Sequence, residues 1–321
     1  MPEYFERYGL SANPFALRVL DPLSSTDDDQ HLLRDIDGFT QLSAVKEYLR
    51  ERIGSPGAPI RPAFVLIAGS EKSGLSTAAN AVLMLYRDMR NLGNRFAAVF
   101  VEALDHSELR LYRRWAAALP NRLQPLKLQL NPEVAKRVQD ASRFSDMDTL
   151  EYELQGVLVA LGPALDAKPG SPVGFGSCLE KIKTSRAVEM ALVVFEGSPT
   201  VCVFTVQTTA NIDVDEFAEQ HREIHVLRLK HLNSQDVPKI LQKKWGTASE
   251  IPLHLPTLGT FCEKQKHTVG VVLRLAERLL RKRVLAYEGL NRAGSWPEDR
   301  ELGLTDLHTL ELLEVLVNGG S

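Results

Sequence analysis

One run of the sequence constrains the fold more than any other. From Phe64 to Leu83 it reads FVLIAGSEKSGLSTAANAVL, an apolar stretch followed by a turn rich in Gly and Ser and then by an amphipathic pattern. This order predicts a buried parallel strand over Ala63–Ala68 and a helix over Ser76–Met89. Glycines and hydroxyls at this spacing are typical of a phosphate-binding loop, G-x-x-x-x-G-K-[ST], which holds phosphate through backbone N–H groups at a helix N-terminus.

The loop lacks the lysine of that pattern. Leu75 occupies the lysine position, and a leucine supplies no positive charge to phosphate oxygens. Because the backbone donors need no particular side chain, phosphate binding can survive this change, whereas efficient catalysis cannot. Lys72 either bends back to replace the missing charge or faces solvent, as most loop lysines do. The residues expected to hold a nucleotide are Gly69, Ser70, Lys72, Ser73, Gly74, Leu75, Ser76 and Thr77.

Strand and helix signals alternate over residues 61–229, which predicts one α/β domain. Five strands separated by helices need crossover connections, so they form a parallel sheet covered by helices on both faces. Further strands are expected over Phe96–Ala103, Pro172–Cys178, Thr200–Gln207 and Glu223–Leu229. The intervening helices are expected over Ser107–Leu119, 147–167, Leu179–Phe195 and Asp213–Gln220.

The two ends of the chain differ from this domain. Residues 1–60 form an N-terminal segment and linker, with the phrase YGLSANPF at Tyr8–Phe15, a run of three aspartates at Asp27–Asp29 and a helix over Gly38–Arg52. Strand signals stop after Leu229, so residues 230–321 are predicted to be an all-helical domain. Its helices are expected over Ser234–Trp245, Pro256–Lys266, Val269–Glu288 and Thr305–Val317.

Charge is distributed unevenly. The formal net charge of the 321 residues is -3, which gives no general attraction to nucleic acid or to an anionic membrane. Residues 228–288, however, contain twelve Lys and Arg against five Asp and Glu. This basic region either binds DNA phosphates without reading sequence or docks the acidic run Asp27–Asp29 of a neighbouring subunit. The side chains expected to follow DNA are Arg278, Arg281, Lys282 and Arg283.

The cysteines and the start of the chain indicate a compartment. The three cysteines, at positions 178, 202 and 262, are odd in number and lie mostly in apolar runs, which is typical of buried thiols under reducing conditions. The opening MPEYFERYGL is charged, and no apolar segment reaches the roughly 20 residues of a membrane-spanning helix. We therefore expect a cytoplasmic protein without membrane insertion.

Taken together, these features resemble the AAA+ ATPases. The branch they resemble contains secretion-pathway ATPase A, the transposition ATPases and the origin-recognition Cdc6 proteins. The resemblance covers about residues 4–288 and is best at Tyr8–Phe15 and at Gly69–Thr77. It implies a P-loop NTPase sheet ordered 5-1-4-3-2, a helical lid, nucleotide at a subunit interface and assembly into a ring or filament. It also implies ATP or ADP as cofactor, with Ser76 as a ligand of magnesium.

The resemblance extends unevenly to the catalytic groups. A Walker B strand ends in two adjacent acids that hold magnesium and polarise the attacking water, but the two candidate segments here offer only Glu180 or Glu196. Arg222 matches the position of an arginine finger, and it is equally a surface arginine at a helix end. Arg274 matches the sensor arginine of the lid, and it equally belongs to a solvated helix face with Arg278.

The joint loss of the loop lysine and the acid pair predicts a degenerate member of the family. We expect a regulatory or scaffold subunit of an oligomer or larger complex, which binds ATP or ADP weakly or not at all and hydrolyses little or none. One alternative is an active ATP-dependent remodelling ATPase, in which Lys72 and one of Glu180 or Glu196 replace the missing groups. A second alternative is a DNA-associated accessory factor that uses the basic helices.

Overall fold

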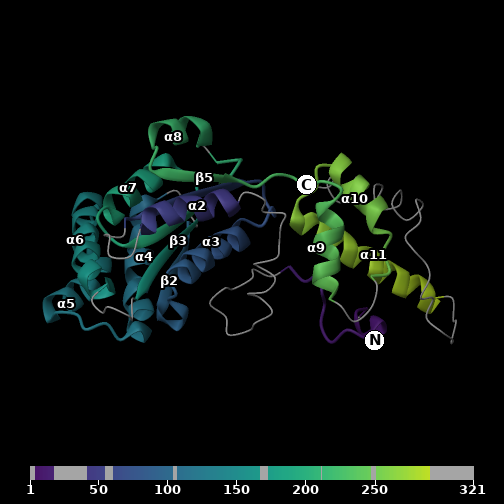
Figure 1. The fold of residues 1–321 in the computed structure, drawn as a ribbon, viewed down its shortest axis with the longest axis horizontal. Helices are drawn as coiled ribbons and strands as arrows, with labels where there is room; N and C mark the ends of the chain where they lie inside the picture. Colours follow the sequence, from purple (N-terminus) through teal and green to yellow (C-terminus); the bar gives the residue numbers. More distant parts are fainter. Residues whose placement is uncertain are drawn as a thin grey trace.

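A computed structural model describes seven stretches of the chain. They are residues 4–17, 42–54, 61–103, 107–166, 173–210, 212–246 and 251–289. The acidic run Asp27–Asp29, the expected helix Thr305–Val317 and the side chain of Arg283 lie outside this description. Figure 1 shows an α/β part built around the sheet and, beside it, a group of helices that carries the last described residues.

The sheet has the predicted strands in the predicted order. All pairs are parallel, and the order is β2-β3-β4-β1-β5, which is the 5-1-4-3-2 order that the family resemblance implies. Every residue of β1, an inner strand between β4 and β5, is buried, because helices cover both faces of a parallel sheet. The strands are β1 (Ala63–Gly69), β2 (Phe96–Glu102), β3 (Gly174–Ile182), β4 (Thr200–Gln207) and β5 (Ile224–Arg228).

Helices cover the two faces of the sheet and bury separate apolar clusters. One face packs against α2 (Leu42–Ile53) and α3 (Leu75–Met89). The other face packs against α4 (Glu108–Leu123), α6 (Met147–Asp166) and α7 (Ser185–Phe195), with contributions from α5 and α8. The remaining elements of this part are α5 (Pro132–Asp140), α8 (Val214–Gln220) and the 3-10 turns η2 (Gly93–Arg95), η3 (Gln124–Leu126) and η4 (Ala141–Arg143).

The expected helix over Leu179–Phe195 is wrong in its first part. The strand β3 continues to Ile182, and α7 begins only at Ser185. Pairing with β2 on one side and β4 on the other fixes β3 as an inner strand, and such tertiary contacts override a weak local pattern. Glycine is needed inside this strand because a Cβ at Gly176 would lie 2.8 Å from Cζ of Phe96 in the packed core.

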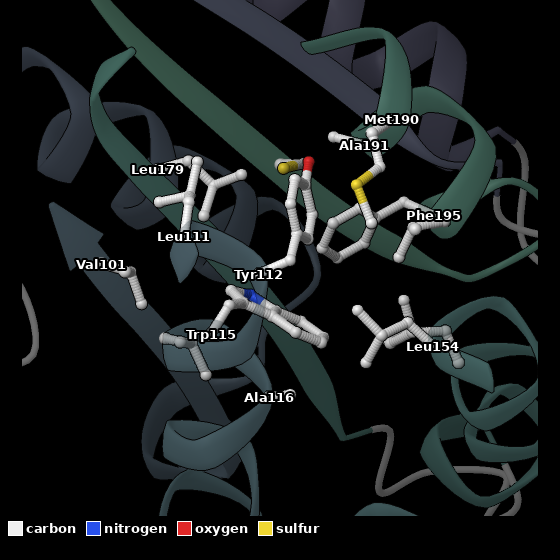
Figure 2. Close-up of a cluster of buried hydrophobic side chains, with 14 of the residues drawn as sticks. Val101, Leu111, Tyr112, Trp115, Ala116, Leu154, Leu179, Met190, Ala191 and Phe195 are labelled. Carbon is white, nitrogen blue, oxygen red and sulfur yellow. The ribbon is translucent and has the colours of Figure 1, made fainter. Parts of the chain in front are cut away.

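An aromatic cluster fills the core beneath α4. Figure 2 shows the indole of Trp115 between side chains of α4, α7 and α6, with Tyr112 and Phe195 nearby. The rings of Trp115 and Phe195 meet edge to face with centroids 5.3 Å apart. The indole N–H donates a hydrogen bond to Oγ of Ser177 over 3.1 Å, and the Tyr112 hydroxyl donates one to the carbonyl oxygen of Ala187 over 2.7 Å. Both buried donors are therefore satisfied, as a stable core requires.

The C-terminal helices form a second core, which also takes in the N-terminal segment. The rings of Phe15 and Trp245 stack with centroids 6.0 Å apart, and Tyr8 meets the same tryptophan edge to face. Nδ2 of Asn13 donates a hydrogen bond to Oε1 of Glu277 over 3.2 Å. Figure 1 shows this segment beside α9 and α11. The elements are η1 (Glu6–Tyr8), α9 (Asp236–Trp245), α10 (Leu255–Lys264) and α11 (Val269–Gly289), and we call residues 232–289 the lid.

None of the helices in the described stretches combines the length and the apolar character needed to cross a bilayer.

Candidate functional site

The loop between β1 and α3 has the strand, turn and helix that its sequence predicts. Strand β1 ends at Gly69 and α3 begins at Leu75. Gly74 precedes the helix with φ at 94°, in the left-handed region that glycine adopts without steric cost. Lys72 at the loop tip also has a positive φ, of 61°, and the N–H of Ser73 donates to the carbonyl oxygen of Ser70 over 3.2 Å.

A cavity of about 380 Å³ opens beside this loop. It lies between the loop, the carboxyl ends of β3 and β4, and the start of α11. An apolar wall is formed by Leu17, Val269 and Leu273, and polar groups come from the two strands. Five of the loop residues expected to hold a nucleotide line the cavity, namely Lys72, Gly74, Leu75, Ser76 and Thr77.

The other three loop residues that were expected to hold a nucleotide do not line the cavity. They are Gly69, Ser70 and Ser73. Ser73 is buried, and its Oγ has no hydrogen-bond partner within the described stretches. A Cβ at Gly69 would lie only 2.5 Å from this Oγ. Gly69 and Ser73 thus contact each other inside the turn, where they shape the loop.

The lid touches the loop directly. The N–H of Gly270 donates a hydrogen bond to the carbonyl oxygen of Lys72 over 2.9 Å. A Cβ at Gly270 would lie 2.9 Å from the Cβ of Lys72, so this approach requires glycine. Arg274 follows one turn later on α11 and is exposed, whereas its neighbour Leu273 lines the cavity. The role of Arg274 as a sensor of nucleotide remains a prediction.

The structure does not bring the candidate acids or Arg222 to the cavity. Glu180 is half-buried on β3, paired in register with Glu102, and it does not line the cavity. Glu196 follows α7 and precedes β4, so it lies at the opposite, amino edge of the sheet. Arg222 is exposed just before β5, at that same edge. An arginine finger acts on a neighbouring subunit, and the role of Arg222 there remains a prediction.

The strand β3 instead presents a lysine to the cavity, and the sequence analysis missed it. Lys181 lines the cavity, and its backbone has φ at 56° where the register of β3 against β4 shifts. Its N–H donates to Oγ1 of Thr205 over 2.9 Å, and its ammonium pairs with the carboxylate of Glu102. The Glu102 hydrogen bond raises the pKa of Lys181, so the ammonium is charged at neutral pH. No local sequence pattern marks such a shift.

The donor set fits phosphate groups but does not fit magnesium. Backbone N–H groups at the start of α3 and the hydroxyls of Ser76 and Thr77 suit phosphate oxygens. Magnesium takes carboxylate oxygens beside the Ser76 hydroxyl, but the residue of β3 that reaches the cavity is Lys181, a cation. Glu71 also lines the cavity, and its carboxylate already pairs with the ammonium of Lys72 over 3.4 Å. Among the described residues, no group of three or more His, Cys, Asp or Glu side chains is placed to hold a metal ion.

Comparison with known proteins identifies the fold. No protein-family model matches the chain, and no curated protein matches it either. A structure of Drosophila ORC bound to DNA is 10% identical, with 98% of this chain and 72% of that chain covered at a TM-score of 0.50. The ORC2 protein of Aeropyrum pernix, solved as ADPNP–ADP complexes, is 13% identical at a TM-score of 0.50. The match covers 82% of this chain and 69% of that chain. Cdc6p from Pyrobaculum aerophilum is 13% identical at a TM-score of 0.49, and the match covers 88% of this chain and 67% of that chain.

At such identities the likeness shows the fold alone. The chain has an α/β P-loop fold of the AAA+ type, in which helices flank a five-stranded parallel sheet, and a helical lid follows the sheet. The predicted fold class is therefore confirmed. Of the three groups named for the family resemblance, these structures belong to the origin-recognition group.

Proposed function

We propose that this chain is a regulatory or scaffold subunit of a larger assembly, which binds adenine nucleotide weakly and hydrolyses little or none. The observation that supports the proposal is the cavity between loop and lid, with Leu75 where a catalytic loop has lysine. Phosphates would be held by the loop backbone and by the hydroxyls of Ser76 and Thr77. The apolar wall of Leu17, Val269 and Leu273 suits a base.

Nucleotide in this cavity would contact both parts of the molecule. The loop belongs to the α/β part and Leu273 to the lid, so the ligand would bind their closed arrangement more tightly than an open one. The free energy of nucleotide binding would then favour the closed position of the lid. A partner protein that recognises the closed position would bind more tightly when nucleotide is present. Among the described residues that line the cavity, Glu71 is the one acid, so a pair of acids that could polarise water is missing there. The partner would then respond to binding and release of the nucleotide, without hydrolysis.

Calorimetric titration of the full chain with ATP and ADP tests this proposal. We expect dissociation constants between about 10 μM and 1 mM, and phosphate release no faster than that of a Ser76→Ala variant. Release above the Ser76→Ala control would favour the remodelling ATPase. Absence of heat at millimolar nucleotide would contradict nucleotide binding and leave a scaffold fold.

A second candidate function is association with DNA through α11. Arg274 and Arg278 are exposed on this helix, and one of the structures with a similar fold was solved bound to DNA. Arg281, in contrast, forms an ion pair with Glu277 at 3.1 Å and lies over the ring of Tyr4. A nonspecific DNA interface would then rest mainly on Arg274 and Arg278.

Titration of a labelled duplex at several salt concentrations tests this second candidate. A double variant Arg274→Gln, Arg278→Gln should weaken binding and reduce the slope of log K against log salt by about one for each lost phosphate contact. The variant Lys136→Gln, at an exposed position on α5, is the matched control and should bind like the wild type. Equal affinities of the double variant and the control would exclude this use of α11.

A further inference from the structure

A β-bulge places a lysine at the cavity from an unexpected strand. In β3, Leu179 pairs with Phe204 and Ile182 pairs with Val206, so one extra residue is inserted on the β3 side. Bulges re-aim side chains, and they are frequent next to functional sites. The bulge contains Lys181 in a left-handed backbone conformation, which is unfavourable for a lysine. An unfavourable conformation kept by the surrounding structure is a reason to look for a function of that residue.

The surroundings of Lys181 hold its ammonium at the cavity. The backbone N–H is bonded to Oγ1 of Thr205, on the neighbouring strand, over 2.9 Å. The ammonium pairs with Glu102, at the end of β2, and about half of the side chain remains exposed, 52%. An ammonium has three N–H donors, and the bond to Glu102 uses one of them. The other donors are available for oxygen atoms of a ligand in the cavity.

We propose that Lys181 supplies the positive charge that Leu75 cannot, and that the cavity binds a nucleotide polyphosphate without a divalent cation. This inference rests on the proposed function, because it concerns the same cavity and its nucleotide. An ammonium between a carboxylate and a phosphate donates N–H hydrogen bonds to both groups, so it bridges them as a metal ion would, with one positive charge in place of two.

The acids near Lys181 explain why the ammonium and a metal ion exclude each other. Glu102, Glu180 and Glu71 all act on the charge of Lys181 and favour its protonated form. Glu102 pairs with the ammonium of Lys181, and Glu71, which lines the cavity, pairs with Lys72 over 3.4 Å. A divalent ion would have to displace an ammonium group from either carboxylate before it could bind there. The cavity therefore differs from a site that binds nucleotide together with magnesium, in which carboxylates are free to hold the metal ion through water.

Lys72 is a weaker candidate for the same role. It also lines the cavity, and its ammonium, like that of Lys181, pairs with a carboxylate, here that of Glu71 over 3.4 Å. Its backbone carbonyl is bonded to Gly270, so the loop tip is fixed against the lid. Lys72 projects from a loop, whereas Lys181 projects from an inner strand, and a rigid element positions a charge more accurately.

The experiment measures binding of ADP and of inorganic pyrophosphate to the full chain by calorimetry, once with magnesium and once with EDTA. The variant is Lys181→Asn, because asparagine tolerates the left-handed backbone and has no charge. The matched control is Lys127→Asn, an exposed lysine after η3 with φ at 49°, outside the cavity lining. A Glu102→Gln variant removes the acid that pairs with Lys181. Circular dichroism confirms that each variant is folded.

The wild type should bind ADP with dissociation constants that agree within threefold in magnesium and in EDTA. Lys181→Asn should weaken both ADP and pyrophosphate at least tenfold, Lys127→Asn should leave them unchanged, and Glu102→Gln should bind equally or more tightly. A tenfold loss of wild-type affinity in EDTA would overturn the inference, and so would unchanged binding by Lys181→Asn. Both of these results would leave the proposed nucleotide binding intact. Absence of wild-type binding to either probe would overturn that proposal and this inference together.

Discussion

The amide N–H of Gly270 lies 2.9 Å from the carbonyl oxygen of Lys72, and this bond joins the lid to the tip of the loop. Gly270 is on the first turn of α11, the helix that also bonds the N-terminal segment through Glu277 and Asn13. One helix thus connects the loop, the cavity and the two ends of the described chain. A change in the loop tip must therefore be accommodated by α11.

Replacing Gly270 by alanine should open this contact. The new methyl group would lie 2.9 Å from Cβ and 3.0 Å from the carbonyl oxygen of Lys72, so loop and lid must separate by some tenths of an ångström. We expect ADP binding to weaken about tenfold, equivalent to about 1.4 kcal/mol, as measured by calorimetry. Gly156→Ala, in α6, is the control, because its new Cβ would be no closer than 3.7 Å to its neighbours. Equal ADP affinities for the two variants would contradict the prediction.

Replacing Leu75 by lysine should strengthen nucleotide binding. Leu75 lines the cavity at the position where the loop pattern has lysine, so a new ammonium there would meet phosphate oxygens. We expect the affinity for ATP to rise about tenfold or more in calorimetric titrations. Leu75→Met keeps the size and the apolar character of the side chain, and it should bind like the wild type. If the lysine and methionine variants bind ATP equally, phosphate does not occupy this part of the cavity.

The sequence predicted the strands and most helices because each carries its own local signal. The apolar run Ala63–Ala68 and the β-branched run Thr200–Gln207 are buried strands in the structure. The boundary at Ile182 was missed because Gly174 and Gly176 weaken the strand pattern of β3, and an apolar helix follows closely. Helix α5, at Pro132–Asp140, was not predicted at all. Boundaries of this kind depend on strand pairing, which a single sequence does not show.

The candidate site was predictable only where it is local. The loop is one continuous segment, so its residues could be named from their spacing. Lys181 reaches the cavity through a bulge and a bond to Thr205, and both depend on the register between two strands. The packing of Phe15 on Trp245 likewise joins segments from the two ends of the chain. Contacts between residues that are far apart in the sequence produce no periodic pattern from which they could be predicted.

Removing the hydroxyl of Ser177 should destabilise the core. The buried indole N–H of Trp115 donates to this hydroxyl over 3.1 Å, and Ser177→Ala would leave it without an acceptor. An unsatisfied buried donor costs about 1–3 kcal/mol, so the free energy of unfolding in urea should fall by that amount. Ser145→Ala, at an exposed position, should change it by less than about 0.5 kcal/mol. A Ser177→Ala variant as stable as Ser145→Ala would show that water or another group replaces the acceptor.

His225 should make stability depend on pH below neutrality. Its ring stacks on Tyr48 with centroids 5.2 Å apart, and burial lowers its pKa from the usual 6.5. Between pH 6.5 and the lowered pKa of the folded state, the unfolded chain gains a proton at this residue and the folded chain does not. The contribution of His225 is therefore fully present above about pH 6.5 and is lost as pH falls through the lowered folded-state pKa.

A His225→Phe variant keeps an aromatic ring on Tyr48 and cannot titrate. Urea unfolding of both proteins between pH 8 and pH 5 should give a difference in free energy that approaches a constant value as the pH rises above about 7, where His225 is mostly neutral in both states of the wild type. Below about pH 6.5 the wild type should lose stability relative to the variant, with a limiting slope of one proton. Parallel stability curves over the whole range would mean that His225 binds its proton equally in the folded and unfolded chain.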